Sequence, residues 1–495
     1  MAGSMTTHYI ACDLGAESGR VMLGTLSEGL LTLEEIHRFP NVTIRLGKSL
    51  RWDILRTFDE LKKGLAKVAG RGVPVESLSV DSWGVDYVWS GLGQDMLAPA
   101  HIYRDPRTDA TFESAIAQSG REKIFAETGI QFMSFNTLYQ LIADREASPG
   151  LLREADGFLC IADYLNFLFS GVRRAEESLA STTQIYNPAT RQWSKVLQEE
   201  FALPASVFPQ IVPSGTVLGP VLEEVQAETG IGSAKVVATC SHDTGAAVAA
   251  VPAGEGSDWA YLSSGTWSLI GVELASPLIN DGTREANFTN EGGFGGTTRF
   301  LKNIVGLWIL QECRRDWERR GEQWDYATLN RLAAVVEPLV TLINPDDDRF
   351  VKPGDMLAKV ESFARETGQP VPETPGEFTR TILQSLALLY RSTLARIEAL
   401  TGRSITKLHI VGGGSQSALL NQFAANATGR PVFAGPVEAT AIGNILIQAV
   451  AGGQLASLAD LRRTVQNSFP IAGFTPGDGA DWEAAAERFE AIRKR

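Results

Sequence analysis

Two short glycine-containing turns are the parts of this chain best suited to hold an anion. The first is DLGAESGR, residues 13–20, and the second is SSGT, residues 263–266. Apolar, β-prone residues flank both runs, so each is predicted to be the tip of a β-hairpin. Backbone N–H groups and hydroxyls at such a tip can bind phosphate. Glycine hairpins are also common without any ligand, and either turn alone is compatible with that interpretation.

Asp243 is the main candidate for proton transfer. It lies in the run CSHDTGAAVAAV, after the strand-like KVVAT and before a helix rich in small residues. A carboxylate at that position can accept a proton from a hydroxyl group. Asp243 or Thr244 can equally cap the N-terminus of the helix, and His242 can be a packed, hydrogen-bonded residue. Capping by Thr244 would still leave Asp243 available as a base.

Asp13 ends a predicted strand and opens the first glycine turn, so its carboxylate is expected near whatever that turn binds. For a polyphosphate, the expected mediator is Mg²⁺ bound through water, because Mg²⁺ keeps several waters and uses few carboxylates. A plain Asp-x-Gly turn is the structural alternative.

The three glycines of residues 412–414 follow the strand-like run LHIV. They either let a flat ligand approach the backbone or simply join a strand to a helix.

Several common nucleotide and hydrolase motifs are absent from the sequence. There is no GxxxxGK[ST], and no GxGxxG follows a strand with a ribose-binding acid at the usual distance. HExxH and GxSxG do not occur either. Paired hairpins therefore remain as the predicted phosphate-binding device.

Length and composition fit a large soluble enzyme. The chain has 495 residues, 44% of them hydrophobic and 21% charged, which predicts two domains with ample cores. A net charge of −13 argues against nucleic acid and against an anionic membrane surface as partners. Four widely spaced cysteines without a CxxC pair favour a reducing, cytoplasmic location. No apolar run approaches the length needed to span a bilayer.

Each half of the chain is predicted to open with strands and to continue with alternating helices and strands. A boundary is predicted at PAGEGS, residues 252–257, which gives domains over 1–252 and 253–495. Residues 374–377, TPGE, have the parts of a capping box with proline at the first helical position. The helix after it has apolar residues at near-helical spacing and should bury one face; they are Ile382, Leu386, Leu389, Leu394 and Ile397.

The chain resembles the FGGY family of carbohydrate kinases in an ordered set of segments spanning nearly its whole length. These segments are DLGAESGR, DSWGVDYV, YRDPRT, SHDTGAAVA, YLSSGTWSL, NEGG, LKN with GLWILQECRR, and LHIVGGGSQSALLNQ. The resemblance implies an α/β fold of two ribonuclease-H-like domains with an interdomain cleft, shared with actin and heat-shock ATPases. The first domain would bind sugar and phosphate, and the second would bind the nucleotide. A monomer or a small homo-oligomer would fit.

The resemblance also implies roles for individual residues. Asp243 would accept the proton of the sugar hydroxyl, and Asp13 would position Mg²⁺ through water. The residues implied to contact the sugar are Gly84, His242, Asp243, Thr244 and Asn303. Those implied to bind ATP are Ala16, Glu17, Ser18, Gly19, Arg20 and Thr266 at the phosphates, and Gln311 and Gly413 at the nucleotide. Glu17 replaces a residue that is often small and polar, so its side chain is expected to point away from the phosphates.

Three segments within the resemblance indicate the substrate. GIQFMSFNTLYQL, SHDT with its small-residue helix, and INPDDDRF imply transfer of the ATP γ-phosphate to the 1-hydroxyl of the ketose L-rhamnulose. A kinase of L-fuculose or xylulose, a non-catalytic sugar or nucleotide sensor, and a chaperone-like ATPase are alternatives. The presence of both Asp13 and Asp243 argues against a sensor. A chaperone would need an added peptide-binding domain, for which no residues are expected to remain.

Overall fold

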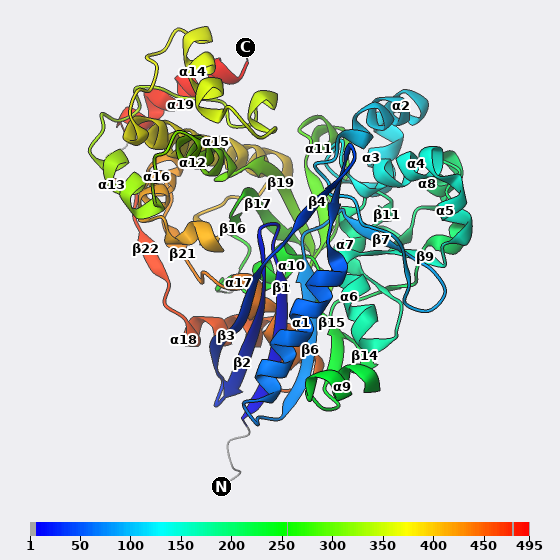
Figure 1. The fold of residues 1–495 in the computed structure, drawn as a ribbon. Coiled ribbons are helices and arrows are strands. Elements are labelled where there is room, and N and C mark those ends of the chain that lie inside the picture. Colours follow the sequence, from blue (N-terminus) through cyan, green and yellow to red (C-terminus); the bar gives the residue numbers. More distant parts are fainter. Residues whose placement is uncertain (1–5, 255, 478–479, 495) are drawn as a thin grey trace. The chain divides into compact units, whose positions relative to one another are not determined.

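The computed structural model describes residues 6–254, 256–477 and 480–494, which pack into two compact units (Figure 1). Unit 1 comprises the residues up to Pro252 together with Glu273–Phe300 and Ala439–Ser468. Unit 2 comprises Ala253–Val272, Leu301–Glu438 and the residues from Phe469 onward. The first change of unit falls at the start of the PAGEGS segment, whose Glu255 lies outside the described residues. The chain then returns to unit 1 twice.

A six-stranded mixed sheet forms the centre of unit 1, in the order β14-β15-β6-β1-β2-β3. β1, β2 and β3 form an antiparallel meander, and β6 pairs in parallel with β1 and with β15. The first glycine turn joins β1 to β2, with Asp13 opposite Arg20, which confirms the predicted hairpin. The bounds of these strands are β1 Thr7–Leu14, β2 Ser18–Ser27, β3 Leu30–Pro40, β6 Val75–Ser82, β14 Thr216–Pro220 and β15 Lys235–Ala238.

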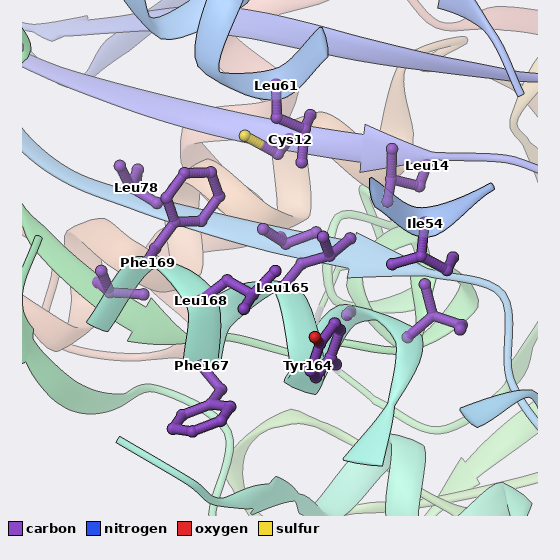
Figure 2. Close-up of a cluster of buried hydrophobic side chains, with 14 of the residues drawn as sticks. Cys12, Leu14, Ile54, Leu61, Leu78, Tyr164, Leu165, Phe167, Leu168 and Phe169 are labelled. Atoms are coloured by element: carbon purple, nitrogen blue, oxygen red, sulfur yellow. The ribbon is translucent and has the colours of Figure 1, made fainter. Parts of the chain in front are cut away.

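The alternation of side chains along β1 separates the core of unit 1 from its polar residues. Cys12 and Leu14 point into a buried apolar cluster with Leu61 of α1 (Ile54–Ala69) and residues of α6 (Ile161–Ser170), as Figure 2 shows. Residues one position away, including Asp13, point to the opposite face of the sheet. There α17 (Ala439–Ala451) packs against β1 and β6. The carboxylate of Asp13 is thus directed away from the apolar core.

Shorter elements complete unit 1, including a three-stranded sheet in the order β8-β7-β9. The strands are β4 Thr43–Leu46, β5 Ser49–Trp52, β7 Tyr87–Ser90, β8 Met96–Ala98, β9 Gly157–Cys160, β10 Ala175–Glu176, β11 Tyr186–Asn187, β12 Gln192–Trp193 and β13 Ile211–Val212. The helices are α2 Asp109–Ser119, α3 Arg121–Thr128, α4 Thr137–Ala147, α5 Pro149–Glu154, α7 Glu177–Thr182, α8 Lys195–Glu200, α9 Glu223–Thr229, α10 Asp243–Ala249, α11 Asp281–Glu285 and α18 Leu458–Ser468.

The second large sheet has the order β18-β19-β17-β16-β20-β21-β22, and unit 2 contains β16, β20, β21 and β22 whole. β16 pairs antiparallel with β17 across the second glycine turn and in parallel with β20. The same arrangement relates β1 to β2 and β6 in unit 1, so the predicted repetition is present. The strands are β16 Trp259–Ser264, β17 Trp267–Leu274, β18 Thr289–Gly292, β19 Thr298–Val305, β20 Lys407–Val411, β21 Val432–Ala434 and β22 Ala472–Phe474.

The longest helix of unit 2, α15 (Pro375–Thr401), begins as predicted. Glu377 N donates to Thr374 Oγ1 at 3.3 Å, and Thr374 N donates to Glu377 Oε2 at 3.0 Å, which completes the capping box. The five apolar residues predicted to form its inner face are all buried. The other helices of this unit are α12 Trp308–Arg319, α13 Tyr326–Ala334, α14 Met356–Glu366, α16 Ala418–Thr428 and α19 Ala480–Arg493. No helix in the described part of the chain has the length and apolar character that a bilayer crossing requires.

The helix that begins at Asp243 packs closely against α17. A Cβ added at Gly443 of α17 would lie 1.9 Å from Ala246 O of α10, so a side chain there must push the two helices apart. We expect Gly443→Ala to lower the free energy of unfolding by about 1–3 kcal/mol, the usual cost of overpacking. Gly473→Ala is the control, because its added Cβ meets nothing within 4 Å. Urea unfolding of both variants measures the difference, and equal stability would contradict the close approach.

Candidate active site

The first glycine turn joins β1 to β2 through Gly15, Ala16 and Glu17. Gly15 N donates to Ser18 O at 2.9 Å and closes the turn. Asn41 supports it from the side, since its backbone N donates to Glu17 O and its Nδ2 donates to Gly15 O, both at 3.0 Å. Glu17 is exposed. The turn is therefore hydrogen-bonded at its base and at its side, with Glu17 exposed at its tip.

Gly19 and Arg20 follow the turn on β2. A Cβ at Gly19 would lie 2.3 Å from Phe39 Cζ and 2.7 Å from Leu14 Cδ2, so only glycine fits there. Arg20 Nη2 donates to Asp13 Oδ2 in an ion pair. Arg20, predicted to bind phosphate, and Asp13, predicted to position Mg²⁺, thus neutralise each other's charge. A polyphosphate bound at the turn would compete with Asp13 for Arg20.

A second carboxylate, Asp81, lies beside Asp13 and is not among the residues predicted from the sequence. The two are register partners on the parallel strands β6 and β1, so their side chains share a face. Asp81 is fully buried, and Asn444 Nδ2 of α17 donates to its Oδ2 at 2.6 Å. Burial and the neighbouring Asp13 raise its pKa well above the ordinary value. The similar strand endings YIACD and SLSVD are the sequence signal that could have found it.

Gly84 lies in the turn after β6, against α7. A Cβ added there would lie 2.9 Å from Thr182 Oγ1. The next residue, Val85, has a φ of 68°, which a β-branched residue adopts only where its surroundings enforce it. Val85 N donates to Thr182 Oγ1 at 3.3 Å, and Thr137 Oγ1 donates to Val85 O at 2.7 Å. The turn is therefore fixed from both sides.

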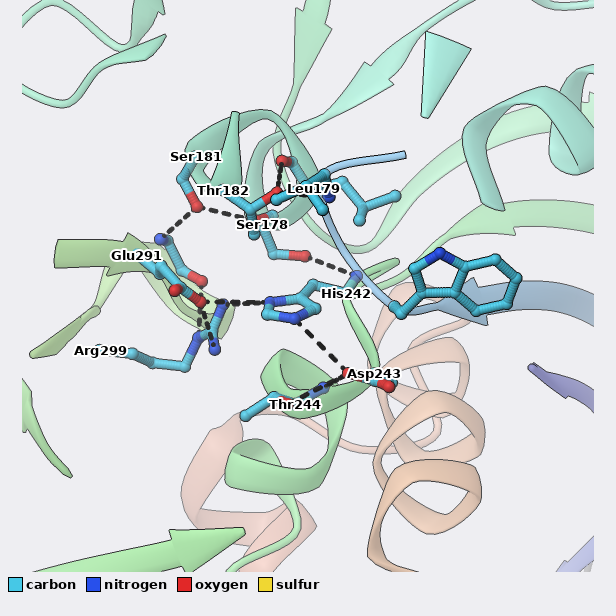
Figure 3. Close-up of polar contacts among 12 residues, drawn as sticks. Ser178, Leu179, Ser181, Thr182, His242, Asp243, Thr244, Glu291 and Arg299 are labelled. Atoms are coloured by element: carbon cyan, nitrogen blue, oxygen red, sulfur yellow. Dashed lines mark hydrogen bonds and ion pairs between the residues drawn. The ribbon is translucent and has the colours of Figure 1, made fainter. Parts of the chain in front are cut away.

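The consecutive residues His242, Asp243 and Thr244 lie at the start of α10 (Figure 3). Thr244 N and Oγ1 both donate to Asp243 Oδ1, at 2.5 and 3.1 Å, and His242 Nε2 lies 3.5 Å from the same oxygen. No hydrogen bond from the described residues reaches Oδ2, and the side chain is 29% exposed. His242 occupies the N-cap position without a side-chain cap, so neither Asp243 nor Thr244 is the N-cap residue of this helix. Asp243 thus has one fixed oxygen and one available oxygen.

The surroundings of Asp243 favour proton uptake. Burial raises the pKa of Asp243, and the negative charge of Asp13 raises it further. The neighbouring His242 lowers the pKa, but the net result is an increase. A carboxylate with a raised pKa is a stronger base and is suited to accepting a proton near neutral pH.

A buried ion pair between Glu291 and Arg299 orients His242. Neither residue is assigned a role from the sequence, although Glu291 lies in the NEGG segment. Arg299 of β19 is fully buried, with Nη1 3.1 Å from Glu291 Oε2 and Nη2 3.1 Å from His242 Nδ1. His242 Nδ1 also lies 3.2 Å from Glu291 Oε2, so this edge of the ring contacts both the guanidinium and the carboxylate, while Nε2 faces Asp243. Although burial opposes it, Arg299 together with His242 holds the pKa of Glu291 below its ordinary value. Ser178 Oγ accepts the backbone N–H of His242 at 3.1 Å.

In unit 2, the structure brings Thr266 and Gln311 into one connected segment. Leu307 N donates to Gly265 O and Trp308 N donates to Thr266 O, both at 3.1 Å, which ties the second glycine turn to the start of α12. Gln311 lies in the first turn of that helix. Its Oε1 is buried and has no hydrogen-bond partner among the residues that the structure describes. A buried acceptor of this kind fits a ligand that brings an N–H or O–H group.

Gly413 and Asn303, also in unit 2, lie on separate elements. Gly413 follows β20 in a short 3₁₀ turn, and a Cβ added to it meets nothing within 4 Å, whereas one at Gly414 would lie 2.0 Å from Ser264 Oγ. The glycine run is therefore packed at its last residue and open at its middle one, where a flat group could approach the backbone. Asn303 is half-buried on β19.

Family models and sequence relatives identify the same family for this chain. Residues 8–250 match the model of the FGGY family of carbohydrate kinases, N-terminal domain, and residues 260–452 match that of the C-terminal domain. A rhamnulokinase from Bacteroides thetaiotaomicron is 45% identical over 98% of this chain and 99% of its own length. A rhamnulokinase from Oceanobacillus iheyensis is 40% identical over 93% of this chain and 97% of its own length.

Solved structures share the fold at low sequence identity. A ligand-bound xylulose kinase from Lactobacillus acidophilus superposes with a TM-score of 0.82 at 15% identity, covering 99% of this chain and 98% of that one. Plasmodium falciparum glycerol kinase with ADP gives 0.80 at 12% identity, with the same coverage. This chain belongs to the FGGY family of carbohydrate kinases.

Proposed function

We propose that this chain transfers the γ-phosphoryl group of ATP to the 1-hydroxyl of L-rhamnulose, forming L-rhamnulose 1-phosphate and ADP in the breakdown of L-rhamnose. Near full-length relatives named rhamnulokinase, at 45% and 40% identity, support this ketose over L-fuculose and xylulose. The observation that carries the chemistry is the Asp243 carboxylate, with Oδ1 fixed by Thr244 and Oδ2 available. The four cysteines, all free and buried, support a reducing, cytoplasmic setting.

Asp243 is the proton acceptor in this proposal. Its Oδ2 takes the proton of the 1-hydroxyl while the hydroxyl oxygen bonds to the γ-phosphorus and the bond from that phosphorus to the ADP oxygen breaks. The fixed Oδ1 keeps the carboxylate oriented, and the raised pKa strengthens the base. Phosphoryl transfer depends mainly on placing the attacking and leaving oxygens in line, so a rigidly held base suits it.

Four further residues are assigned to the sugar in this proposal. In unit 1 these are Gly84, through its backbone in the fixed turn, and His242 and Thr244 beside the base. In unit 2 the sugar ligand is Asn303. The enforced conformation of Val85 supports a binding role for the turn, because such conformations concentrate where a site must be preorganised.

The ATP phosphates are bound by the first glycine turn, residues 16–20, and by Thr266, whereas Gln311 and Gly413 serve the nucleotide. The unpartnered Gln311 Oε1 and the open backbone at Gly413 fit such a ligand. Asp13 would hold Mg²⁺ through water, and the adjacent Asp81, whose buried Oδ1 has no partner among the described residues, adds a second acidic oxygen that fits a hydrated cation. When bound, Mg²⁺ neutralises phosphate charge.

Coupled ADP release with MgATP against L-rhamnulose, L-fuculose, D-xylulose and glycerol tests the choice of substrate. We expect kcat/KM for L-rhamnulose to exceed each of the others by about tenfold or more, since contacts to individual substrate groups discriminate by at least this factor. Preference for another sugar would overturn the assignment of L-rhamnulose as the substrate but would leave the proposed kinase chemistry intact. Absence of turnover with every sugar would favour a sensor instead.

A further inference from the structure

A pocket in unit 1 is lined by none of the residues assigned to the proposed reaction. It has a volume of about 80 Å³ and is bounded by β5, β7, residues 98–101 and the end of α4. Its polar lining consists of Arg51, Tyr87, Trp89, His101, Arg107 and Asp144, with Ser148 at one side. Backbone pairing between Arg51 and His101 holds β5 against residues 98–101.

The carboxylates near this pocket are already occupied by donors. Tyr87 Oη and Trp89 Nε1 donate to Asp144 Oδ2 at 2.6 and 2.7 Å, and Arg107 Nη1 donates to Asp144 Oδ1. Asp105 lies 3.8 Å from His101 Nδ1 and accepts from backbone N–H groups, including that of Arg107 at 3.0 Å. Neither carboxylate is therefore open to pair with Arg51.

Positive charge and unused donors remain at the pocket. Arg107 Nε is buried without a hydrogen-bond partner in the described part of the chain. Arg51 donates to Ser49 Oγ at 2.9 Å and Pro99 O at 2.5 Å, both uncharged, and no carboxylate of the described residues forms an ion pair with it. Burial, Arg107 and Arg51 together lower the pKa of His101 to about 4, although Asp144 and Asp105 act in the opposite direction.

We propose that this pocket binds a small oxyanion of phosphate size between Arg51 and Arg107. Two guanidinium groups present planar N–H donors that match the oxygens of phosphate, and both line the same small volume. The volume of about 80 Å³ is several times the roughly 10–15 Å³ that one water molecule needs, so a small anion fits. The ligand would neutralise the half-buried Arg51 and satisfy the Nε of Arg107.

Anomalous diffraction from crystals soaked in selenate, an oxyanion of phosphate size, tests this site by position. A selenium peak between Arg51 and Arg107 in the wild-type chain that is absent from Arg51→Gln is the expected result. No peak there in the wild type would overturn the proposal. A peak that persists in Arg51→Gln would also overturn it, because it would show an adventitious ion that does not need the paired arginines.

A solution experiment uses the same variant with inorganic phosphate as probe. The indole N–H resonance of Trp89, which lines the pocket, should shift on titration with phosphate, and Arg51→Gln should weaken the apparent affinity by about tenfold or more. Arg107→Lys is a second variant that keeps a cation beside Asp144, and it should weaken binding as well. Arg71→Gln, at an exposed arginine paired with Glu34, is the control and should leave the titration unchanged. Unchanged affinity in both pocket variants would contradict the site.

Discussion

Asp243→Asn is expected to fold and to bind ATP like the wild-type chain while its kcat falls by about 10² to 10⁴, the usual contribution of a positioned general base. The asparagine can keep the contact from Thr244 through its carbonyl oxygen, so the geometry at the start of α10 should survive. What it lacks is an oxygen basic enough to take the proton of the sugar hydroxyl. Steady-state kinetics with L-rhamnulose, together with calorimetric ATP binding, separates the two effects.

The matched control for this prediction is Asp281→Asn, the same chemical change at a side chain that is 78% exposed. It should leave kcat unchanged. The pH profile adds an independent test: the base must be ionised, so kcat/KM should fall as pH decreases through the raised pKa of Asp243. Full activity of Asp243→Asn would remove this residue from the mechanism.

Arg299→Met is expected to lower the free energy of unfolding by about 3–5 kcal/mol, because the buried carboxylate of Glu291 loses its guanidinium partner and keeps only the contact with His242. The side chains of Arg299 and Glu291 are 0% and 5% exposed, so water cannot replace the lost contact. The kcat should fall as well, by about 10²-fold, since His242 Nδ1 loses one of the two contacts that orient the ring beside Asp243. Urea unfolding and steady-state kinetics measure the two losses.

The double variant Glu291→Met/Arg299→Met distinguishes stability from positioning. Removing both charges should recover most of the stability, since buried ion pairs can be replaced by apolar residues of similar size at little cost. The kcat should stay low, because the orientation of His242 is not restored. Recovery of kcat together with stability would show that Arg299 has only a structural role. Arg71→Met, at an exposed ion pair, should change stability by about 0–1 kcal/mol.

Local features of this chain were predictable because the signals lie within a few residues of one another. Both glycine hairpins, the capping box at Thr374 and the buried face of α15 follow from residue types at short spacing, and all are present in the structure. The FGGY fold was likewise identifiable from segments in a fixed order. The side chains of Asp13 and Asp243 were placed at strand and helix ends by the same local reasoning.

The partners of these residues were not predictable, because they come from distant parts of the sequence. Arg299 contacts His242 across 57 positions, and Asn444 contacts Asp81 across 363. Alternation along a strand shows which face a side chain occupies but not what packs against that face. For the same reason, the sequence pattern did not indicate that Glu273–Phe300 and Ala439–Ser468 pack within unit 1.

The position of the phosphoryl group on the product tests the central claim most directly. L-rhamnulose, a 6-deoxyketose, has its only primary hydroxyl at carbon 1, so the proton-coupled ³¹P NMR signal of the product distinguishes the sites of transfer. We predict a triplet from a phosphate ester on a CH₂ group, formed by the wild-type chain and at a greatly reduced rate by Asp243→Asn. A doublet from a secondary ester, or inorganic phosphate alone, would contradict the proposed reaction.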